Sequence, residues 1–382
     1  MIIERFIGWV KTAPSGARAE AAGALARAYL VSPLSAHERN LAAVALTSLL
    51  DDPSVAVRRA MAEVLAPDAA SPAHVVAALA QDVVEVATPV IVLSPLLEDG
   101  DLVDLAASGT ARIQSAVAAR LDLQPSVAAA LAEVAGLEAC IVLARNPGAA
   151  LTGSIYVRMI ERHGSSALLR EALLARTDLP IGMRQLLVRT LADNLAAFVS
   201  GRDWISADRA RAVAGDACER ATMGIATGLE RAERRRLVRH LRTSGQLTPG
   251  FLLRALVAGN LGVFEAAVAE LAGVDEARVA SLLRDRQASA FDALCRRAGL
   301  PDSAQVAFRV ALDVWRIHGA PEDGQVPVAV RRAMVERVLS AHASARRQAA
   351  DPLTQQLRRL ATDAARDEAR ALAGAIDGRA AA

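Results

Sequence analysis

The segment VAVRRAMAEVLAP, residues 55–67, is an apolar helical run that ends in a short loop carrying a proline. The same arrangement returns four times before residue 181, with runs at Val84–Leu93, Ile113–Leu121, Cys140–Ala144 and Leu169–Ala175. Taking the run ends as Leu65, Leu93, Leu121, Arg145 and Arg176 gives steps of 28, 28, 24 and 31 residues. Self-similarity at a period of roughly 20–50 residues indicates a helical array in which each unit buries its apolar face against its neighbours.

The composition favours an all-α protein. Hydrophobic residues make up 53% of the chain and aromatic residues only 3%. Most of the apolar residues are Ala, Leu and Val; Ala and Leu are among the strongest helix formers, and Ala is small enough to let helices pack closely. A chain of 382 residues is too long for one compact core and suits two or three domains.

The sequence also predicts a compartment. No run of about 18 uncharged apolar residues occurs, so we expect no transmembrane helix and no membrane insertion. Residues 1–5 contain an acid and lack the basic start of a secretory signal. The cysteines Cys140, Cys218 and Cys295 lie far apart, which is typical of buried thiols in a reducing compartment. We therefore expect a cytoplasmic protein.

The distribution of charge and the spacing of the predicted helices divide the chain into domains. Residues 1–200 carry 16 basic and 20 acidic side chains, whereas residues 201–382 carry 28 and 22. This step predicts a boundary near Ser200-Gly201. The expected organisation is N-terminal helices at 1–34, a repeat solenoid at 35–200, a compact helical domain at 201–318, a linker at 319–327 and a C-terminal tail of amphipathic helices at 328–382.

Short motifs in both halves carry a family resemblance. The first half contains VRRA at 57–60, LAQD at 79–82, VATPV at 86–90 and LSPL at 93–96. The second contains GQLTP at 245–249, LLRAL at 252–256, FEAA at 264–267 and LCRRAGLP at 294–301. Together, over residues 35–315, these motifs resemble the bacterial domain-of-unknown-function family 2336. The resemblance implies HEAT-like helical repeats and no established activity, so the expected fold begins with a HEAT-like right-handed α-solenoid.

Arg58 and Arg59 are candidate binding residues with two interpretations. They occupy one helix, close to the acidic helix starts at Asp51, Asp52 and Asp82. In HEAT-like repeats, Asp and Arg commonly hydrogen-bond between adjacent units, and this structural interpretation is the favoured one. In the other interpretation, an exposed arginine pair binds a phosphate or carboxylate of a partner.

An acidic ridge is the second candidate. Residues 51–104 hold ten acids against two arginines, and most of the acids stand at helix starts, where the helix dipole favours them. Stacked helix starts would place Asp52, Asp82, Glu98 and Asp101 along one edge of the solenoid. Such a ridge, beside the groove of a repeat array, predicts a protein partner with a basic or amphipathic helix.

A basic helix face is the third candidate. Arg231, Arg235, Arg239 and Arg242 follow helical spacing and line one side of a helix, a pattern that can neutralise nucleic-acid phosphates. Glu230 and Glu233 compensate it locally, and no aromatic residue is available to stack on bases. We therefore favour a solvated helix face and keep nucleic-acid binding as an alternative.

No motif of catalysis or of cofactor binding occurs. The six histidines are scattered singly, and GxSxG, Walker A and GxGxxG patterns are missing. We expect no cofactor and no metal. The preferred function is a non-catalytic scaffold that binds a partner in its groove, with self-association through the C-terminal helices as a further option. The alternatives are a nucleic-acid binder and an enzyme with an unrecognised site.

Overall fold

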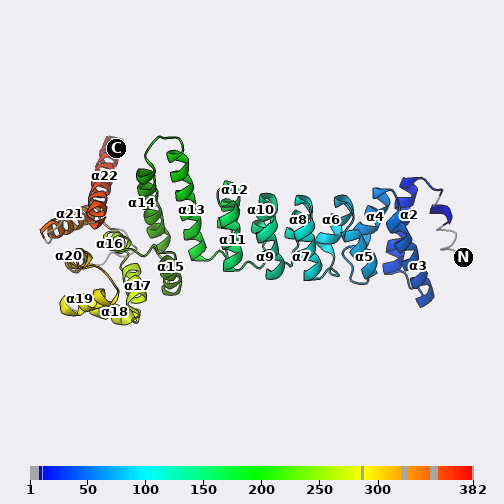
Figure 1. The fold of residues 1–382 in the computed structure, drawn as a ribbon, viewed down its shortest axis with the longest axis horizontal. Helices are drawn as coiled ribbons and strands as arrows, with labels where there is room; N and C mark the ends of the chain where they lie inside the picture. The colour runs from blue at the N-terminus through cyan, green and yellow to red at the C-terminus, as the bar shows by residue number, and fades with distance from the viewer. Residues whose placement is uncertain (1–7, 11, 285–287, 320–325, 345–351, 381–382) are drawn as a thin grey trace. The chain divides into compact units, whose positions relative to one another are not determined.

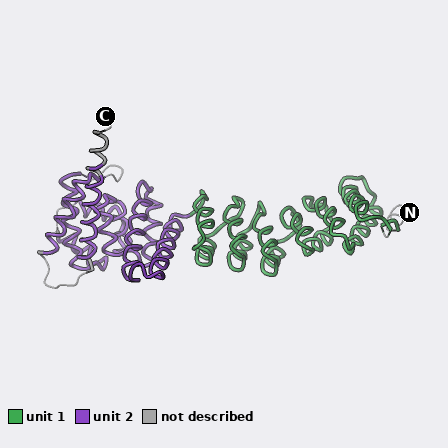
Figure 2. Tube along the Cα trace, turned by 90° about the horizontal axis from the view of Figure 1, so that it is seen from above, with its two compact units in different colours: residues 1–179 green, residues 180–382 purple. Residues whose placement is uncertain are grey.

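The computed structural model in Figure 1 describes residues 8–10, 12–284, 288–319, 326–344 and 352–380. Over these ranges the secondary structure is helical, and the β pairing found is one isolated parallel bridge between Leu123 and Ala149. The prediction of an all-α protein is confirmed. The chain divides into two compact units, residues 1–179 and 180–382, which Figure 2 distinguishes by colour.

Unit 1 is a series of short helices joined by tight loops. They are α2 (Ser15–Val31), α3 (Ala36–Ser48), the 3-10 turn η1 (Leu49–Asp51), α4 (Val55–Leu65), α5 (Ala73–Ala80), α6 (Val84–Leu93), α7 (Asp99–Ser108), α8 (Ala111–Ala118), α9 (Pro125–Val134), α10 (Leu137–Arg145), α11 (Gly153–His163) and α12 (Ala167–Leu174).

These helices pack in two rows. One row runs α2, α4, α6, α8, α10 and α12, each helix in contact with the next, and the other row includes the contacts of α7 with α9 and of α9 with α11. Consecutive helices alternate in direction (Figure 1). The handedness of the array and its likeness to HEAT repeats stay predictions.

Local sequence explains where these helices begin and which face they bury. Ser35 and Glu38 form the predicted capping box, because the Ser35 hydroxyl accepts from the Glu38 backbone N–H and the Glu38 carboxylate accepts from the Ser35 N–H at 2.9 Å. On α4, Val57, Met61 and Leu65 recur at a spacing of four and are fully buried. Each such side chain stabilises the fold by about 1.5–3 kcal/mol.

Unit 2 comprises longer helices around a buried centre. They are α13 (Ile181–Ser200), α14 (Ala207–Ala226), α15 (Arg231–Thr243), α16 (Pro249–Val257), α17 (Leu261–Ala272), α18 (Glu276–Arg284), α19 (Ala288–Arg297), α20 (Asp302–His318), α21 (Val328–Ser344) and α22 (Pro352–Ala380). Every residue from Gly250 to Val257 on α16 is buried. Helix α16 contacts α14, α17, α20, α21 and α22, so the core of this unit forms around it.

The division of the chain differs from the expected one in three places. Helix α13 belongs to unit 2, so the boundary in the sequence falls between Leu179 and Pro180 rather than at Ser200-Gly201. Helices α21 and α22 contribute Met334, Val338 and Leu357 to the shared core, so the expected tail is an integral part of unit 2. At the other end α2 packs on α4 and extends the array. Of the expected linker, residues 320–325 lie outside the described residues.

Candidate functional site

Arg58 links neighbouring helix pairs of unit 1. Its Nε donates to Oδ2 of Asp82 at 2.5 Å, its Nη2 donates to Oδ1 at 2.9 Å, and its Nη1 donates to the Asp52 carbonyl oxygen. Burial alone would raise the pKa of Asp82, but the hydrogen bonds from Arg58 outweigh it and hold that pKa below its usual value. The structural interpretation of Arg58 is thus confirmed, and the Asp82 carboxylate already has a partner.

Asp52 is also engaged inside the array. Its carboxylate accepts two hydrogen bonds from Arg18 on α2, at 2.8 and 2.9 Å, and only 7% of the residue is exposed. The hydrogen bond from Arg18 lowers the pKa of Asp52. Asp52 does not cap α4, because Ser54 holds the cap position and Asp52 accepts from the Ser54 N–H. Asp52 is therefore buried and paired inside the array.

The remaining predicted residues of unit 1, Arg59, Glu98 and Asp101, are exposed. Arg59 pairs with Glu63 one turn further along α4, and both side chains are more than half exposed. Asp101 accepts from the Glu98 N–H at 3.0 Å and closes the first turn of α7. Asp101 and Asp82 line the same space between α5 and α7, whereas Glu98 is not part of that lining. The row of Asp52, Asp82, Glu98 and Asp101 along one edge stays a prediction.

A groove between α5 and α7 nevertheless brings two of the predicted acids together. Helix α7 packs closely on α9, and a space of about 570 Å³ opens between α7 and α5. Asp82, Asp101 and Asp104 line it together with apolar residues, including Val83 and Leu105. Asp104 is exposed, and its carboxylate has no ion-pair partner among the described residues. The groove therefore combines apolar walls with uncompensated negative charge.

The basic face of α15 is largely neutralised by its neighbours. The carboxylate of Glu276 on α18 accepts from Arg231 Nε at 3.0 Å and from Arg235 Nε at 2.9 Å, and Arg234 approaches it at 3.3 Å. Burial would raise the pKa of Glu276, but these arginines outweigh it and lower that pKa. Glu276 is 5% exposed, so the three cations surround a buried anion rather than an open surface.

Of the two remaining arginines of the basic face, Arg242 has a carboxylate partner among the described residues and Arg239 does not. Arg242 donates to the carboxylate of Glu270 at 3.0 Å and to its backbone oxygen at 2.8 Å. Arg239 is exposed and is the member of the predicted set for which the described residues offer no carboxylate partner. Sequence reasoning placed the arginines correctly on one helix but could not foresee the acids of α17 and α18 beside them.

Within the described ranges, no three His, Cys, Asp or Glu side chains converge closely enough to hold a metal ion. In the same part of the chain, no helix combines the length and the apolar character needed to cross a membrane.

The fold and the groove define the class of this protein, an all-α chain in which a helix array precedes a compact helical unit. The chain belongs to a bacterial family described as uncharacterised protein conserved in bacteria (DUF2336), whose model matches residues 86–348. The match begins within α6 and extends beyond α21. No curated protein and no solved structure matches the chain.

The sequence missed Asp104, Val83 and Leu105 as candidate site residues. Asp104 was one of ten acids in its region, and Val83 and Leu105 follow the same pattern as core residues. The signal that separates them is the gap between α5 and α7, which depends on packing between helices distant in sequence.

Proposed function

We propose that this protein is a non-catalytic scaffold that binds a basic, amphipathic helix of a partner protein in the groove between α5 and α7. The observation that carries the proposal is that one groove holds two different binding groups. The Asp104 carboxylate has no ion-pair partner among the described residues, and Val83 in the same lining is 44% exposed. An amphipathic helix offers both complements, since its basic face can approach the acids while its apolar face covers the valine.

The two kinds of contact have different roles. Exposed charges chiefly raise the association rate and select among partners, whereas desolvated apolar contacts supply most of the affinity. Nucleic-acid binding at Arg231, Arg235, Arg239 and Arg242 receives less support, because Glu276 and Glu270 already compensate three of these four cations.

Binding kinetics of a synthetic amphipathic Lys/Leu helical peptide test this proposal. Asp104→Arg should slow association several-fold at low salt, because it reverses an exposed charge at the groove. Val83→Ser should speed dissociation while keeping the start of α6, since serine is a favoured residue at that cap position. Glu171→Arg, an equal charge reversal at an exposed site of α12, is the matched control.

The expected pattern is specific to the groove. If wild-type protein fails to bind the peptide at low salt, or if both groove variants bind it with the kinetics of Glu171→Arg, the groove is not the binding site and the scaffold proposal fails in this form.

A further inference from the structure

A second groove lies within unit 2, between α14 and α22. It has a volume of about 830 Å³, and one wall is the face of α14 from Ser206 to Arg220. At a rise of 1.5 Å per residue, that wall is about 21 Å long. The opposite wall is α22 from Gln355 to Arg366, and Ala212 and Val213 provide the apolar part of the lining.

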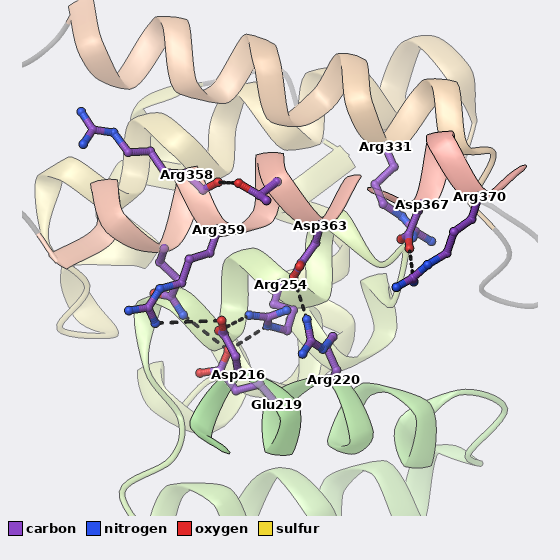
Figure 3. A network of polar contacts seen from close by, with 12 residues as sticks. Asp216, Glu219, Arg220, Arg254, Arg331, Arg358, Arg359, Asp363, Asp367 and Arg370 are labelled. Atoms are coloured by element: carbon purple, nitrogen blue, oxygen red, sulfur yellow. Dashed lines mark hydrogen bonds and ion pairs between the residues drawn. The ribbon is translucent and has the colours of Figure 1, made fainter. Parts of the chain in front are cut away.

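Each carboxylate that lines this groove already has an arginine of its own. Asp216 pairs with Arg254 at 2.7 Å, Asp363 with Arg220 at 2.9 Å, and Asp208 with Arg211 at 2.5 Å. Arg254 is the buried cation of α16, with 4% of the residue exposed, and it also binds Glu219 at 2.8 Å. Figure 3 shows Asp216 and Glu219 gathered around Arg254 beneath α22.

Three arginines of the lining remain uncompensated. Arg209 on α14 and Arg358 and Arg366 on α22 are exposed, and the described residues offer no carboxylate to any of them. Figure 3 shows the Arg358 guanidinium apart from the contacts that join Arg359, Asp216 and Arg254. Arg358 and Arg366 are eight residues apart, which corresponds to about 12 Å along the helix.

We infer that this groove binds an acidic polypeptide segment whose carboxylates meet Arg209, Arg358 and Arg366. Guanidinium groups bind carboxylates through two parallel hydrogen bonds, and three of them on two facing walls fix the path of a ligand. Val213 is 55% exposed in the same lining and offers an apolar contact to the segment between its acids.

The lining favours polypeptide over nucleic acid. It contains no aromatic side chain on which bases could stack. The arginines without a carboxylate partner, Arg209, Arg358 and Arg366, are separated along two helices and do not form the continuous basic strip that closely spaced phosphates require. A peptide can place its carboxylates only where the free arginines are. The site is independent of the groove between α5 and α7, so either proposal can fail without the other.

Fluorescence anisotropy with the full chain tests the inference. The ligand is a labelled helical peptide of Ala and Leu with Glu at every fourth position, and a Gln-for-Glu version is its control. The variant Arg358→Glu/Arg366→Glu should weaken binding of the Glu peptide at least about tenfold, as expected when charge pairs become like-charge pairs. The matched variant Arg236→Glu/Arg278→Glu reverses two other exposed arginines of unit 2, on α15 and α18, and should change affinity less than about twofold.

Four results would overturn the inference. They are no binding of the Glu peptide at low salt, equal binding of the Gln peptide, equal losses in the two double variants, and tighter binding of a 20-base-pair DNA duplex than of the Glu peptide. Sedimentation velocity adds a fifth, since self-association that Arg358→Glu/Arg366→Glu abolishes would assign the groove to a second copy of the chain. Circular dichroism of each variant confirms that folding is retained, and Arg358→Gln/Arg366→Gln replaces the double reversal if it is not.

Discussion

Asn146 and Gly148 fasten the loop after α10 to the loop before α9. The Asn146 side-chain amide donates to the backbone oxygens of Ala118 and Arg120, and its carbonyl oxygen accepts from the Gly148 N–H at 2.9 Å. A Cβ added to Gly148 would stand 1.5 Å from the Leu121 backbone oxygen. The absent side chain is therefore what lets these two loops touch.

Gly148→Ala should accordingly destabilise unit 1. The clash is with backbone rather than with a flexible side chain, so relief requires the two loops to separate, at a cost of about 2 kcal/mol or more. The measurement is urea unfolding followed by circular dichroism. Gly153→Ala is the control, because a Cβ there meets no atom within 4 Å and should be neutral or slightly stabilising. Equal stability of the two variants would contradict this account of Gly148.

At the scale of helices, local sequence predicted what depends on neighbours along the chain. The capping box at Ser35 is found at the start of α3, and the apolar run at Cys140–Ala144 lies within α10. Local sequence could not predict the contacts that form the candidate site. Arg18 and Asp52 are 34 positions apart in the sequence, and the space between α5 and α7 likewise depends on helices that are not consecutive. The helical period of the sequence carries no information about such pairs.

Arg254 gives α16 the least expected of these long-range contacts. It is a charged residue on a helix buried on every side, and it holds Asp216 and Glu219 of α14 at 2.7 and 2.8 Å. Arg254→Met should destabilise unit 2 by about 3 kcal/mol, because it leaves partly buried carboxylates without their main partner. Adding Asp216→Asn and Glu219→Gln should recover much of that loss. Urea unfolding gives the free energy of unfolding of Arg254→Met and of the triple variant Arg254→Met/Asp216→Asn/Glu219→Gln. A triple variant less stable than Arg254→Met would refute the ionic explanation.

At the scale of the whole molecule, the two units carry charge of opposite sign. Residues 1–179 hold 14 basic and 19 acidic side chains, and residues 180–382 hold 30 and 23. The proposed ligands follow this difference, with a basic helix for the groove of unit 1 and an acidic segment for the groove of unit 2. Composition already indicated the asymmetry, but it placed the step about one helix too late, because α13 reads in sequence like another helix of the array.

The position of that step can be tested with fragments. Helix α13 buries Leu187 and the fully buried Gln185, whose amide donates to Gln246 at 2.6 Å and whose carbonyl oxygen is 3.1 Å from His240 Nε2. Burial lowers the pKa of the His240 ring beneath α13. A fragment that begins at residue 201 lacks the helix, exposes the apolar surface of α14 and α15 that it covers, and leaves Gln246 and His240 without their partner.

Residues 180–382 should therefore form a more stable fragment than residues 201–382. Losing one buried leucine costs about 1.5–3 kcal/mol, and each orphaned buried polar group costs about 1–3 kcal/mol more. The shorter fragment should unfold at a clearly lower urea concentration, with a lower slope because it buries less surface. If the two fragments share one midpoint, α13 contributes nothing to unit 2, and the boundary at Ser200-Gly201 that the charge step first indicated would be the correct one.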